Sequence, residues 1–368
     1  MKDVLLVGGG KIGAMITELL ANSGDYRVTV ADHAADALAR VRPSERVDTL
    51  KLDVTGEAAI GPALAGKFAV LSAVPYRLTK YVARAAAEAG VHYFDLTEDV
   101  RTTDYVKKLA AGAASVMMPQ CGLAPGFISI AAHDLAGKFT RLEEVRMRVG
   151  ALTEHPTNGL KYNLTWSTEG LIHEYLAKCD SIIEGRKRKV EPLEGYETFT
   201  LDGTDYEAFN TSGGLGTLGD TLAGRVRNLN YKTIRYPGHC EIMKLLIRDL
   251  RLSEKALTRI FKKAVPLTYQ DVVLIFVSVT GEIDGELRQE SYVNKVYSRE
   301  HGDARWSAIQ ITTASAICAA LDLVASGALP LAGFVRQEDI ALGQFLNNRF
   351  GKNYKSDRLE ALWRQSAQ

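Results

Sequence analysis

The chain has 368 residues, which is enough for two domains or one large one. Apolar residues make up 46%, charged residues make up 24%, and 45 basic side chains balance 44 acidic ones. This composition excludes a disordered polyelectrolyte and disfavours nucleic acid as a main partner. No apolar run reaches the about 18 residues that a membrane span needs, so we expect a soluble protein with no membrane partner.

The N-terminus and the cysteines indicate a cytoplasmic protein. Met1-Lys2-Asp3 leads directly into a short apolar stretch, without the positive region, long apolar region and cleavage site of an export signal. The cysteines are widely separated and form no Cys-x-x-Cys pair or Cys/His cluster with metal-ligand spacing. We therefore expect a reducing compartment and no metal. The four cysteines are Cys121, Cys179, Cys240 and Cys318.

The first 120 residues alternate between short β-branched runs and helical patterns of about ten residues. This alternation predicts an α/β fold, a doubly wound parallel sheet with helices on both faces, over residues 1–122. The expected strands are 3–7, 27–31, 49–52, 68–74, 91–96 and 115–118, and the expected helices are 12–20, 34–41, 80–89 and 104–114.

After residue 122 the pattern changes to strands separated by irregular polar and glycine-rich stretches, which predicts an α+β substrate and dimerisation domain over 123–305. A long helical pattern at 306–325 is followed by a loop and a helical tail, and we expect segment 306–368 to return to the first domain. The basic run 186–189 is predicted to be a solvated turn. The strands expected in the second domain are 145–149, 161–166, 197–201, 233–236 and 272–280.

A glycine motif marks the junction of the first strand and the first helix. Gly8-x-Gly10-x-x-Gly13 gives a tight turn, a close backbone approach and close helix packing, as the pyrophosphate of a dinucleotide requires in a Rossmann-type domain. Asp32, at the end of the second strand, is suited to accept both ribose hydroxyls and to repel a 2′-phosphate. The motif therefore predicts NAD as the cofactor.

Other positions extend the predicted NAD site. Arg40 and Arg42 leave NADP open, and a plain turn or an S-adenosylmethionine site are the other interpretations of the glycines. Segment 72–76 ends the fourth strand, where the nicotinamide is expected, and Tyr76 there is either a site residue or a packed aromatic. The predicted cofactor contacts are Gly8, Gly10, Lys11, Ile12, Gly13, Asp32, His33, Asp53, Val54, Ala73, Val74 and Pro75.

Two later segments are candidates for the substrate site. Segment 210–216 is rich in glycine but neither follows an apolar strand nor opens an amphipathic helix, so it is predicted to be a substrate-contact loop or a plain surface turn. Arg235, at the end of a predicted strand, is suited to hold a substrate carboxylate through two hydrogen bonds, with an ordinary ion pair as the alternative.

These motifs together resemble the saccharopine dehydrogenase family over nearly the whole chain. Within it, segments 121–126, 208–214 and 233–239 look closest to the lysine 6-dehydrogenase branch. That resemblance implies oxidation of the ε-amine of L-lysine by NAD to allysine, which cyclises to 1-piperideine-6-carboxylate, with release of ammonia. His239 differs from the residue expected in the glutamate-forming saccharopine reductases. The segments that carry the family resemblance are 8–13, 72–76, 93–98, 122–126, 235–239 and 333–339.

Such a reaction needs a proton acceptor, because an ammonium group has no lone pair to stabilise the developing imine. His239 is our first candidate for this base, and Asp95, Glu98 and Glu241 are the alternatives. Tyr76 completes the catalytic candidates. The predicted substrate contacts are Arg235 on the α-carboxylate, Thr211, Ser212 and the Cys121 and Gly122 backbone on other polar groups, and Trp166, whose other interpretation is a core residue, along the methylene chain.

Several alternatives stay open. A saccharopine dehydrogenase would need more cations than Arg235, and Lys161 and Arg225 are candidates for them. From a different class, a nucleotide-binding regulatory protein would keep the fold without the chemistry. No histidine lies near Cys121 in the sequence, which disfavours a thiolate nucleophile. We also expect a homodimer, with one face of 272–279 against a second copy.

Overall fold

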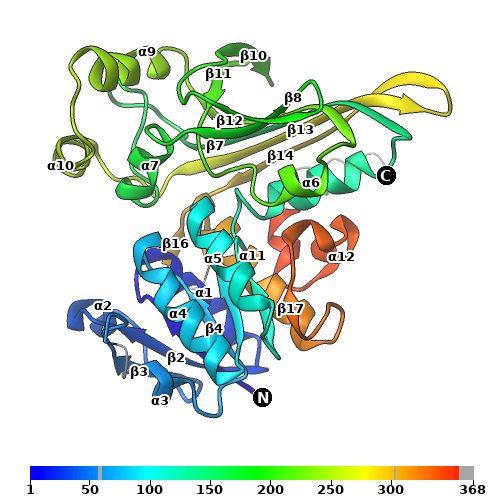
Figure 1. The fold of residues 1–368 in the computed structure, drawn as a ribbon. Helices are drawn as coiled ribbons and strands as arrows, with labels where there is room; N and C mark the ends of the chain where they lie inside the picture. The colour runs from blue at the N-terminus through cyan, green and yellow to red at the C-terminus, as the bar shows by residue number, and fades with distance from the viewer. Residues whose placement is uncertain (57–59, 302–303, 356–368) are drawn as a thin grey trace, which may run out of the picture. The chain divides into compact units, whose positions relative to one another are not determined.

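The computed structural model describes residues 1–56, 60–301 and 304–355, and Figure 1 shows its fold. The chain forms two compact units: unit 1 is Met1–Ile130 with Gln310–Lys352, and unit 2 is Ala131–Ile309 with Asn353–Gln368. The first two of the three boundaries fall inside helices α6 (Phe127–Ala136) and α11 (Ala308–Ala325), and so lie later than the predicted positions after residues 122 and 305. The third lies between Lys352 and Asn353. The part of the predicted tail beyond residue 355 lies outside the described residues.

Unit 1 is built on a seven-stranded parallel sheet in the order β17-β6-β5-β4-β1-β2-β3. The first strand lies between β2 and β4, so the strand order reverses there, as in doubly wound sheets. This confirms the predicted fold class of the first part of the chain. The strands are β1 (Lys2–Val7), β2 (Tyr26–Asp32), β3 (Val47–Lys51), β4 (Ala69–Ser72), β5 (His92–Asp95), β6 (Val116–Met118) and β17 (Gly333–Phe334).

Helices cover both faces of this sheet because its strands are apolar on both sides. Leu5 and Val70 pack with Val82 of α4 and Val106 of α5 on one face. On the other face, a Cβ atom at Gly13 of α1 would contact the Leu6 side chain. Besides α6 and α11, the helices of unit 1 are α1 (Lys11–Asn22), α2 (Ala35–Ala39), α3 (Ile60–Leu64), α4 (Tyr76–Ala89), α5 (Val100–Ala110) and α12 (Leu342–Asn347), with single turns η2 (Gln337–Asp339) and η3 (Gly351–Tyr354).

From Gln310 onward, helix α11 belongs to unit 1, and β17 adds a parallel strand beside β6. The Gln310 side chain donates to the Lys11 carbonyl at 3.0 Å, which places α11 beside the start of α1. In the part of the chain that the structure describes, α11 alone is long and apolar enough to cross a membrane, but 83% of it is buried, as is typical of a core helix. The predicted return of the C-terminal helix is confirmed.

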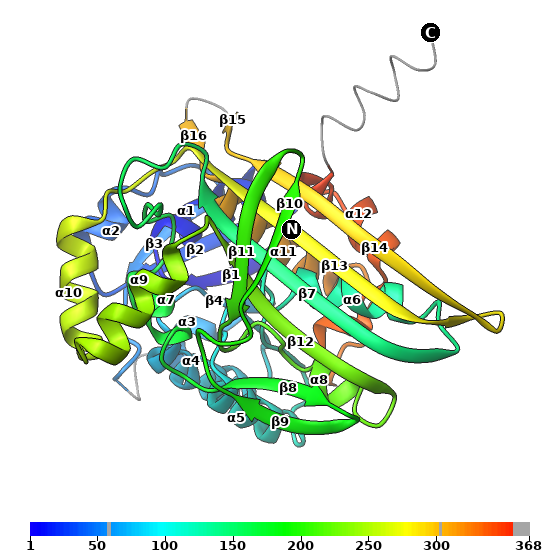
Figure 2. The same ribbon diagram turned by 90° about the horizontal axis from the view of Figure 1, so that it is seen from above.

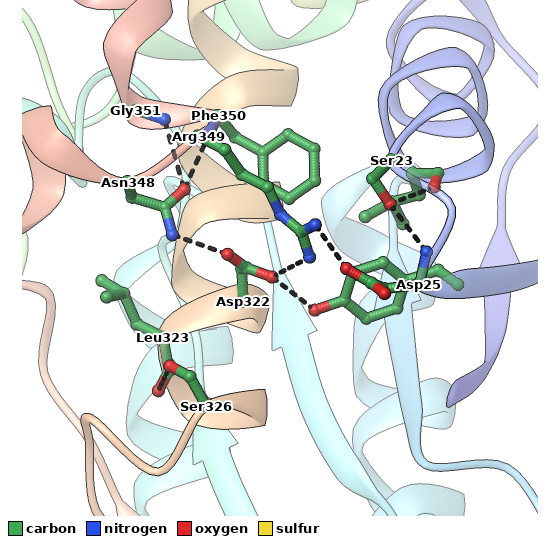
Figure 3. Close-up of polar contacts among 11 residues, drawn as sticks. Ser23, Asp25, Asp322, Leu323, Ser326, Asn348, Arg349, Phe350 and Gly351 are labelled. Atoms are coloured by element: carbon green, nitrogen blue, oxygen red, sulfur yellow. Dashed lines mark hydrogen bonds and ion pairs between the residues drawn. The ribbon is translucent and has the colours of Figure 1, made fainter. Parts of the chain in front are cut away.

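A partly buried polar cluster joins α11 to the segment after α12 and to the start of β2 (Figure 3). The Asp322 carboxylate accepts hydrogen bonds from the Tyr26 hydroxyl at 2.8 Å, from Asn348 Nδ2 at 2.8 Å and from Arg349 Nη2 at 2.6 Å. Arg349 also forms an ion pair with the exposed Asp25. The single carboxylate of Asp322 thus joins three separate segments of unit 1.

We predict that Asp322→Ala lowers the free energy of unfolding by about 2 kcal/mol, because it leaves the buried Tyr26 hydroxyl and the half-buried Asn348 and Arg349 donors without their acceptor. Asp25→Asn, at the exposed end of the same guanidinium, should change it little. Urea unfolding followed by circular dichroism makes the comparison. Equal, small effects of both substitutions would show that the cluster does not stabilise unit 1.

Unit 2 is built on an eight-stranded mixed sheet in the order β10-β11-β12-β7-β13-β14, with β8 on β12 and β9 on β8 (Figure 2). In its centre, β7 pairs parallel with β12 and antiparallel with β13. The predicted α+β class of the second part is confirmed. The strands are β7 (Arg141–Thr153), β8 (Cys179–Ile183), β9 (Arg186–Val190), β10 (Glu197–Leu201), β11 (Thr204–Asn210), β12 (Val226–Arg235), β13 (Asp271–Ile283) and β14 (Glu286–Tyr297), with a separate pair β15 (Arg299–His301) and β16 (Ala304–Trp306).

The helices at one end of unit 2 enclose an apolar cluster that supports the candidate substrate site. Leu171 and Ile172 of α7, Met243 of α9, and Leu257 and Phe261 of α10 are buried in this cluster. The helices of unit 2 are α7 (Thr168–Glu174), α8 (Leu218–Thr221), α9 (His239–Lys244), the π-helical turn η1 (Leu245–Asp249) and α10 (Glu254–Ala264).

The strand predicted at 161–166 is wrong. Asn158 Nδ2 donates to the Tyr162 carbonyl at 2.8 Å, so a side chain takes the place of a neighbouring strand. Leu164 makes only one bridge, with Leu267. The segment is therefore joined to its neighbour at a single bridge and does not form a strand.

The turn predicted at 186–189 is also wrong, because these residues lie in β9 and pair with β8. The turn lies at Glu184 and Gly185, which have φ angles of 51° and 76°. All four basic residues are exposed. Their strand buries no face, so no alternation of apolar and polar residues marks it in the sequence.

The stretch 272–279, predicted to form a dimer face, lies in β13 between β7 and β14. Val273, Ile275 and Val277 are completely buried within the chain itself. This stretch is therefore not an exposed apolar surface, and the homodimer stays a prediction.

Candidate functional site

The loop after β1 has the backbone geometry of a dinucleotide-binding turn. Gly8 has a φ angle of 112°, and a Cβ atom there would lie 2.6 Å from the Ala73 carbonyl oxygen. A Cβ atom at Gly13 would collide with the Gly8 carbonyl oxygen. Both positions require glycine, because the loops after β1 and β4 and helix α1 approach one another so closely.

The start of α1 fits the pyrophosphate that the motif predicts. Gly10 is the N-cap of α1, no side chain caps this helix, and a Cβ atom at Gly10 would meet nothing within 4 Å. The backbone of Lys11, Ile12 and Gly13 forms the first turn. An uncapped helix N-terminus with open space in front of it is suited to a phosphate group.

The carboxylate of Asp32 is fixed at the end of β2, where the ribose is expected. It accepts hydrogen bonds from the Gly9 N–H at 2.8 Å and from the Ala34 N–H at 2.9 Å, and the exposed His33 ring lies 3.1 Å away. Asp53 is exposed and accepts from the Thr55 N–H at 2.9 Å. Val54, in contrast, packs in the core, so its side chain does not present a surface to the adenine.

Two residues of the predicted nicotinamide region begin α4. Pro75 is the N-cap of α4 and Tyr76 is its first residue, half-buried, with the Arg77 guanidinium 5.7 Å from the centre of the Tyr76 ring. Ala73 and Val74 are also half-buried in the loop that contacts Gly8. The structure thus brings the ends of β1, β2 and β4 to one edge of the sheet.

Asp95 is a structural residue. It is completely buried, and its carboxylate accepts hydrogen bonds from the Tyr93 hydroxyl at 2.6 Å and from the N–H groups of Thr97 and Gln120 at 2.9 Å. Burial raises the pKa of Asp95 to about 6. Because its oxygens are all engaged, the structure does not support Asp95 as the base.

Glu98 lies three residues further along and remains partly exposed. Burial, with smaller contributions from Asp99 and Asp95, raises the pKa of Glu98 to about 7. A carboxylate with a pKa near neutrality is able to accept and release a proton at physiological pH. Of the predicted bases, Glu98 therefore has the most suitable protonation chemistry.

Part of the Cys121 and Gly122 backbone is engaged inside unit 1, and its predicted substrate role stays a prediction. The Cys121 N–H donates to the Asp95 carbonyl at 2.7 Å, and the Gly122 carbonyl accepts from the Phe127 N–H at 2.9 Å. Gln337 Nε2 lies 3.1 Å from the Cys121 sulfur, and burial raises the pKa of this thiol. These groups are used inside unit 1, which also argues against a thiolate nucleophile.

In unit 2, Arg235 ends β12 and is 2% exposed. Its Nε donates to the Tyr175 hydroxyl at 2.9 Å, and its Nη1 donates to the Thr233 hydroxyl at 2.6 Å and to the Ile234 carbonyl at 2.8 Å. The Tyr162 ring centre lies 5.1 Å from the guanidinium carbon. No described residue forms an ion pair with Arg235 or a hydrogen bond with its Nη2, although the negative charge of Glu174, the residue before Tyr175, acts on the guanidinium at longer range.

The structure does not support His239 as the base. His239 is completely buried, with Nδ1 2.9 Å from the Leu160 carbonyl oxygen and Nε2 3.0 Å from the Tyr175 hydroxyl. Burial, together with the positive charge of Arg235, lowers the pKa of His239 to about 3. Both ring nitrogens are engaged, and such a weakly basic imidazole does not take up a proton near neutral pH. The sequence motif placed His239 beside Arg235 correctly but did not reveal its burial.

Sequence reasoning missed Tyr175, Tyr162 and Glu207. Glu207 is the register partner of Arg235 across β11 and β12, yet its two carboxylate oxygens accept the N–H groups of Gly238 at 2.7 Å and Cys240 at 2.6 Å. It therefore fixes the start of α9. The alternation of side chains between the two faces of β11 was the only sequence signal for Glu207. Tyr162 and Tyr175 lie in segments with no recognisable motif.

The predicted loop 210–216 joins β11 to α8 and lies next to the Arg235 cluster. The Ser212 N–H donates to the carbonyl of Glu174, the residue before Tyr175, at 3.1 Å. Thr211 is 2% exposed, and its hydroxyl has no hydrogen-bond partner among the residues that the structure describes. Trp166 is half-buried and its Nε1 donates to the Tyr162 hydroxyl at 3.2 Å. The loop thus lies beside the segment that carries Tyr175, and its contact with a substrate stays a prediction.

Comparison with protein families identifies both parts of the chain. Residues 4–118 match the model described as the saccharopine dehydrogenase NADP binding domain, and residues 122–349 match the saccharopine dehydrogenase C-terminal domain. Unit 1 therefore contains a pyridine nucleotide-binding domain, and the S-adenosylmethionine and plain-turn interpretations of Gly8 to Gly13 are wrong. The match does not distinguish NAD from NADP.

Individual relatives are distant. The chain is 26% identical to the glutamate-forming, NADP-dependent saccharopine dehydrogenase of Saccharomyces cerevisiae, covering 72% of this chain and 61% of that protein. It is 20% identical to mitochondrial alpha-aminoadipic semialdehyde synthase of Mus musculus, covering 80% of this chain and 33% of that protein. The chain thus spans less than two thirds of the curated relatives named here.

Two solved structures share the fold. Apo saccharopine dehydrogenase from Saccharomyces cerevisiae superposes with a TM-score of 0.76 at 17% identity, covering 95% of this chain and 98% of that one. Homospermidine synthase from Legionella pneumophila in complex with NAD gives a TM-score of 0.67 at 13% identity, covering 96% and 89%. At these identities the likeness concerns the fold alone.

We predict that Gly10→Ala folds normally but binds NADH at least about tenfold more weakly, because its methyl group occupies the open space in front of α1. The matched control is Gly112→Ala, whose methyl group also meets nothing within 4 Å but lies after α5. Fluorescence titration with NADH measures both. Native affinity in Gly10→Ala would place the dinucleotide elsewhere.

Proposed function

Because the chain belongs to the saccharopine dehydrogenase family, we propose that it is an NAD-dependent dehydrogenase that oxidises the ε-amine of L-lysine to allysine and ammonia. The observation that carries this proposal is the buried guanidinium of Arg235, which has no carboxylate partner among the described residues. A buried charge of this kind is stabilised when a ligand supplies the counter-charge. The α-carboxylate of an amino acid is such a ligand.

The proposal of lysine over saccharopine rests on the resemblance of segments 121–126, 208–214 and 233–239 and on the number of carboxylates that the site must hold. Lysine has one carboxylate, whereas saccharopine has three and needs further cationic contacts. Of the two additional candidates, Lys161 donates to the Pro237 carbonyl at 2.9 Å, and Arg225 is exposed in the turn after α8. The names of the relatives support saccharopine as the second candidate substrate, so the two must be compared directly.

The geometry of Asp32 supports NAD as the cofactor. Its carboxylate is fixed by the Gly9 and Ala34 N–H groups, and a fixed negative charge at this position repels a 2′-phosphate. Arg40 pairs with Asp36 at 3.6 Å, one turn away within α2. Bound NAD supplies the hydride acceptor.

The chain's own residues supply binding and proton transfer. Arg235 holds the α-carboxylate, and Glu98 takes a proton from the ε-ammonium so that the amine lone pair is available. Loss of a hydride from the ε-carbon leaves an imine, and addition of water gives the aldehyde and ammonia. Glu241 is exposed and pairs with Lys244 at 3.3 Å, so it is a weaker candidate for the base. The overall reaction converts lysine, NAD and water to allysine, ammonia, NADH and a proton.

Three further expectations stay predictions: a homodimer, a cytoplasmic location and the absence of a metal. In residues 1–56, 60–301 and 304–355 no group of three or more His, Cys, Asp or Glu side chains is arranged to hold a metal ion.

The direct test measures NADH or NADPH formation with purified protein, offering L-lysine and saccharopine with NAD and with NADP. We expect turnover with lysine and NAD and much slower turnover with NADP. Turnover with saccharopine alone would overturn the substrate assignment. NADH binding without turnover of any amine would favour a non-catalytic protein.

The anchor role of Arg235 is tested in the same assay with Arg235→Lys, which keeps the charge but loses the planar fork. We expect the KM for lysine to rise about tenfold or more while NADH affinity is unchanged. Arg188→Lys on the exposed strand β9 is the matched control. An unchanged KM in Arg235→Lys would remove Arg235 from the substrate site.

We predict that kcat/KM rises with pH through about 7, because the raised pKa of Glu98 means that its basic form accumulates above that pH. Glu98→Gln should lower kcat by about 100-fold and abolish this limb of the profile. The exposed Glu88→Gln is the control. A limb that persists in Glu98→Gln would assign the base to another group.

A further inference from the structure

Three side chains of unit 2 form a hydrogen-bonded chain that ends at Arg235. The Leu160 carbonyl oxygen lies 2.9 Å from His239 Nδ1, and His239 Nε2 lies 3.0 Å from the Tyr175 hydroxyl. The same hydroxyl lies 2.9 Å from Arg235 Nε. All three side chains are at most 2% exposed, so water does not replace these partners.

The chemistry of each group fixes the direction of every bond. A carbonyl oxygen only accepts, so Nδ1 of His239 carries the hydrogen and Nε2 of the neutral ring is an acceptor. Arg235 Nε only donates, so the Tyr175 oxygen accepts from it and the Tyr175 hydroxyl hydrogen points to His239 Nε2. The hydrogen bonds thus run in one direction: Arg235 donates to Tyr175, Tyr175 donates to His239 and His239 donates to the Leu160 carbonyl.

This hydrogen-bonded chain requires an uncharged His239 ring. Protonated Nε2 would present a second N–H group to the Tyr175 oxygen and leave the hydroxyl hydrogen without its acceptor. The cationic Arg235, Tyr175 and Tyr162 face the ring, and the nearby Glu207 carboxylate is engaged by the N–H groups of Gly238 and Cys240. Glu174 lies beside Tyr175 and acts on Arg235 through its charge, but no described carboxylate forms an ion pair with His239.

We infer that Tyr175 and His239 are positioning residues that orient the Arg235 guanidinium without neutralising it. A carboxylate in place of Tyr175 would compensate the charge inside the protein, whereas a hydroxyl fixes Nε and leaves the charge for the substrate. His239 fixes the Tyr175 hydroxyl in turn. As a determinant of lysine binding, this inference rests on the proposed function.

The kinetic test compares Tyr175→Phe, His239→Phe and His239→Gln. We expect Tyr175→Phe and His239→Phe to raise the KM for lysine about tenfold with a smaller change in kcat, an unchanged NADH affinity and an unshifted pH profile. His239→Gln provides an amide that is able to bond to Tyr175 again, and it should restore much of the loss. Equal defects in kcat and NADH affinity, or a KM near the native value in Tyr175→Phe, would overturn the inference.

Tyr236→Phe is the matched control. It also removes a hydrogen-bonded hydroxyl, which donates to the Thr153 carbonyl at 2.9 Å, from the residue that follows Arg235. The Tyr236 side chain packs against a different apolar cluster from the one that contains Tyr175, so we expect native kinetics from this variant.

A second measurement does not depend on lysine turnover. In ¹⁵N NMR spectra of the full-length protein, the His239 signal, assigned by its loss in His239→Gln, should show a neutral ring with hydrogen on Nδ1 from pH 5 to 9. A ring that gains a proton near pH 6.5, or that carries hydrogen on Nε2, would overturn the inference. If the native protein turns over no amine, the proposed function fails, and this spectrum still tests the hydrogen-bonded chain.

Discussion

The guanidinium of Arg235 lies in the interior of unit 2, and its hydrogen bonds go only to uncharged groups. Burying an ion costs several kcal/mol even after the protein relaxes around it. Here that cost is offset by three donated hydrogen bonds and by the ring of Tyr162, 5.1 Å from the guanidinium carbon. A substrate carboxylate would remove the remaining penalty, so the same arrangement that destabilises the empty site favours its occupation.

In unit 1 the requirement is different: the backbone after β1 must come close to the pyrophosphate of the dinucleotide. Gly8 and Gly13 allow the loop, the β4 end and helix α1 to come together with no side chain between them. Glu98 follows the carboxyl end of β5 in the same sheet, and its partial burial raises its pKa to about 7. The unit therefore combines a glycine-lined loop suited to a dinucleotide with a partly exposed carboxylate, Glu98, whose raised pKa suits proton transfer.

The elements with a local signature could be predicted from the sequence. The glycine spacing and Asp32 identified the dinucleotide loop, and apolar periodicity located the sheet of unit 1 because its strands are buried on both faces. The exposed strand β9 and the extended segment at 161–166 were assigned wrongly, since neither buries an alternating face. Tyr175 lies 60 positions before Arg235, so only the tertiary fold brings it to the guanidinium. His239 was assigned as a base because its burial and the charge of Arg235 cannot be read from one sequence.

The central claim is that Arg235 holds the carboxylate of an amino-acid substrate. A crystal structure of the protein with NADH and L-lysine tests it most directly. An oxygen of the lysine carboxylate should lie within hydrogen-bond distance of Arg235 Nη2, with Nε still bonded to the Tyr175 hydroxyl. Lysine bound away from Arg235, or a protein carboxylate bonded to Nη2 in its place, would contradict it.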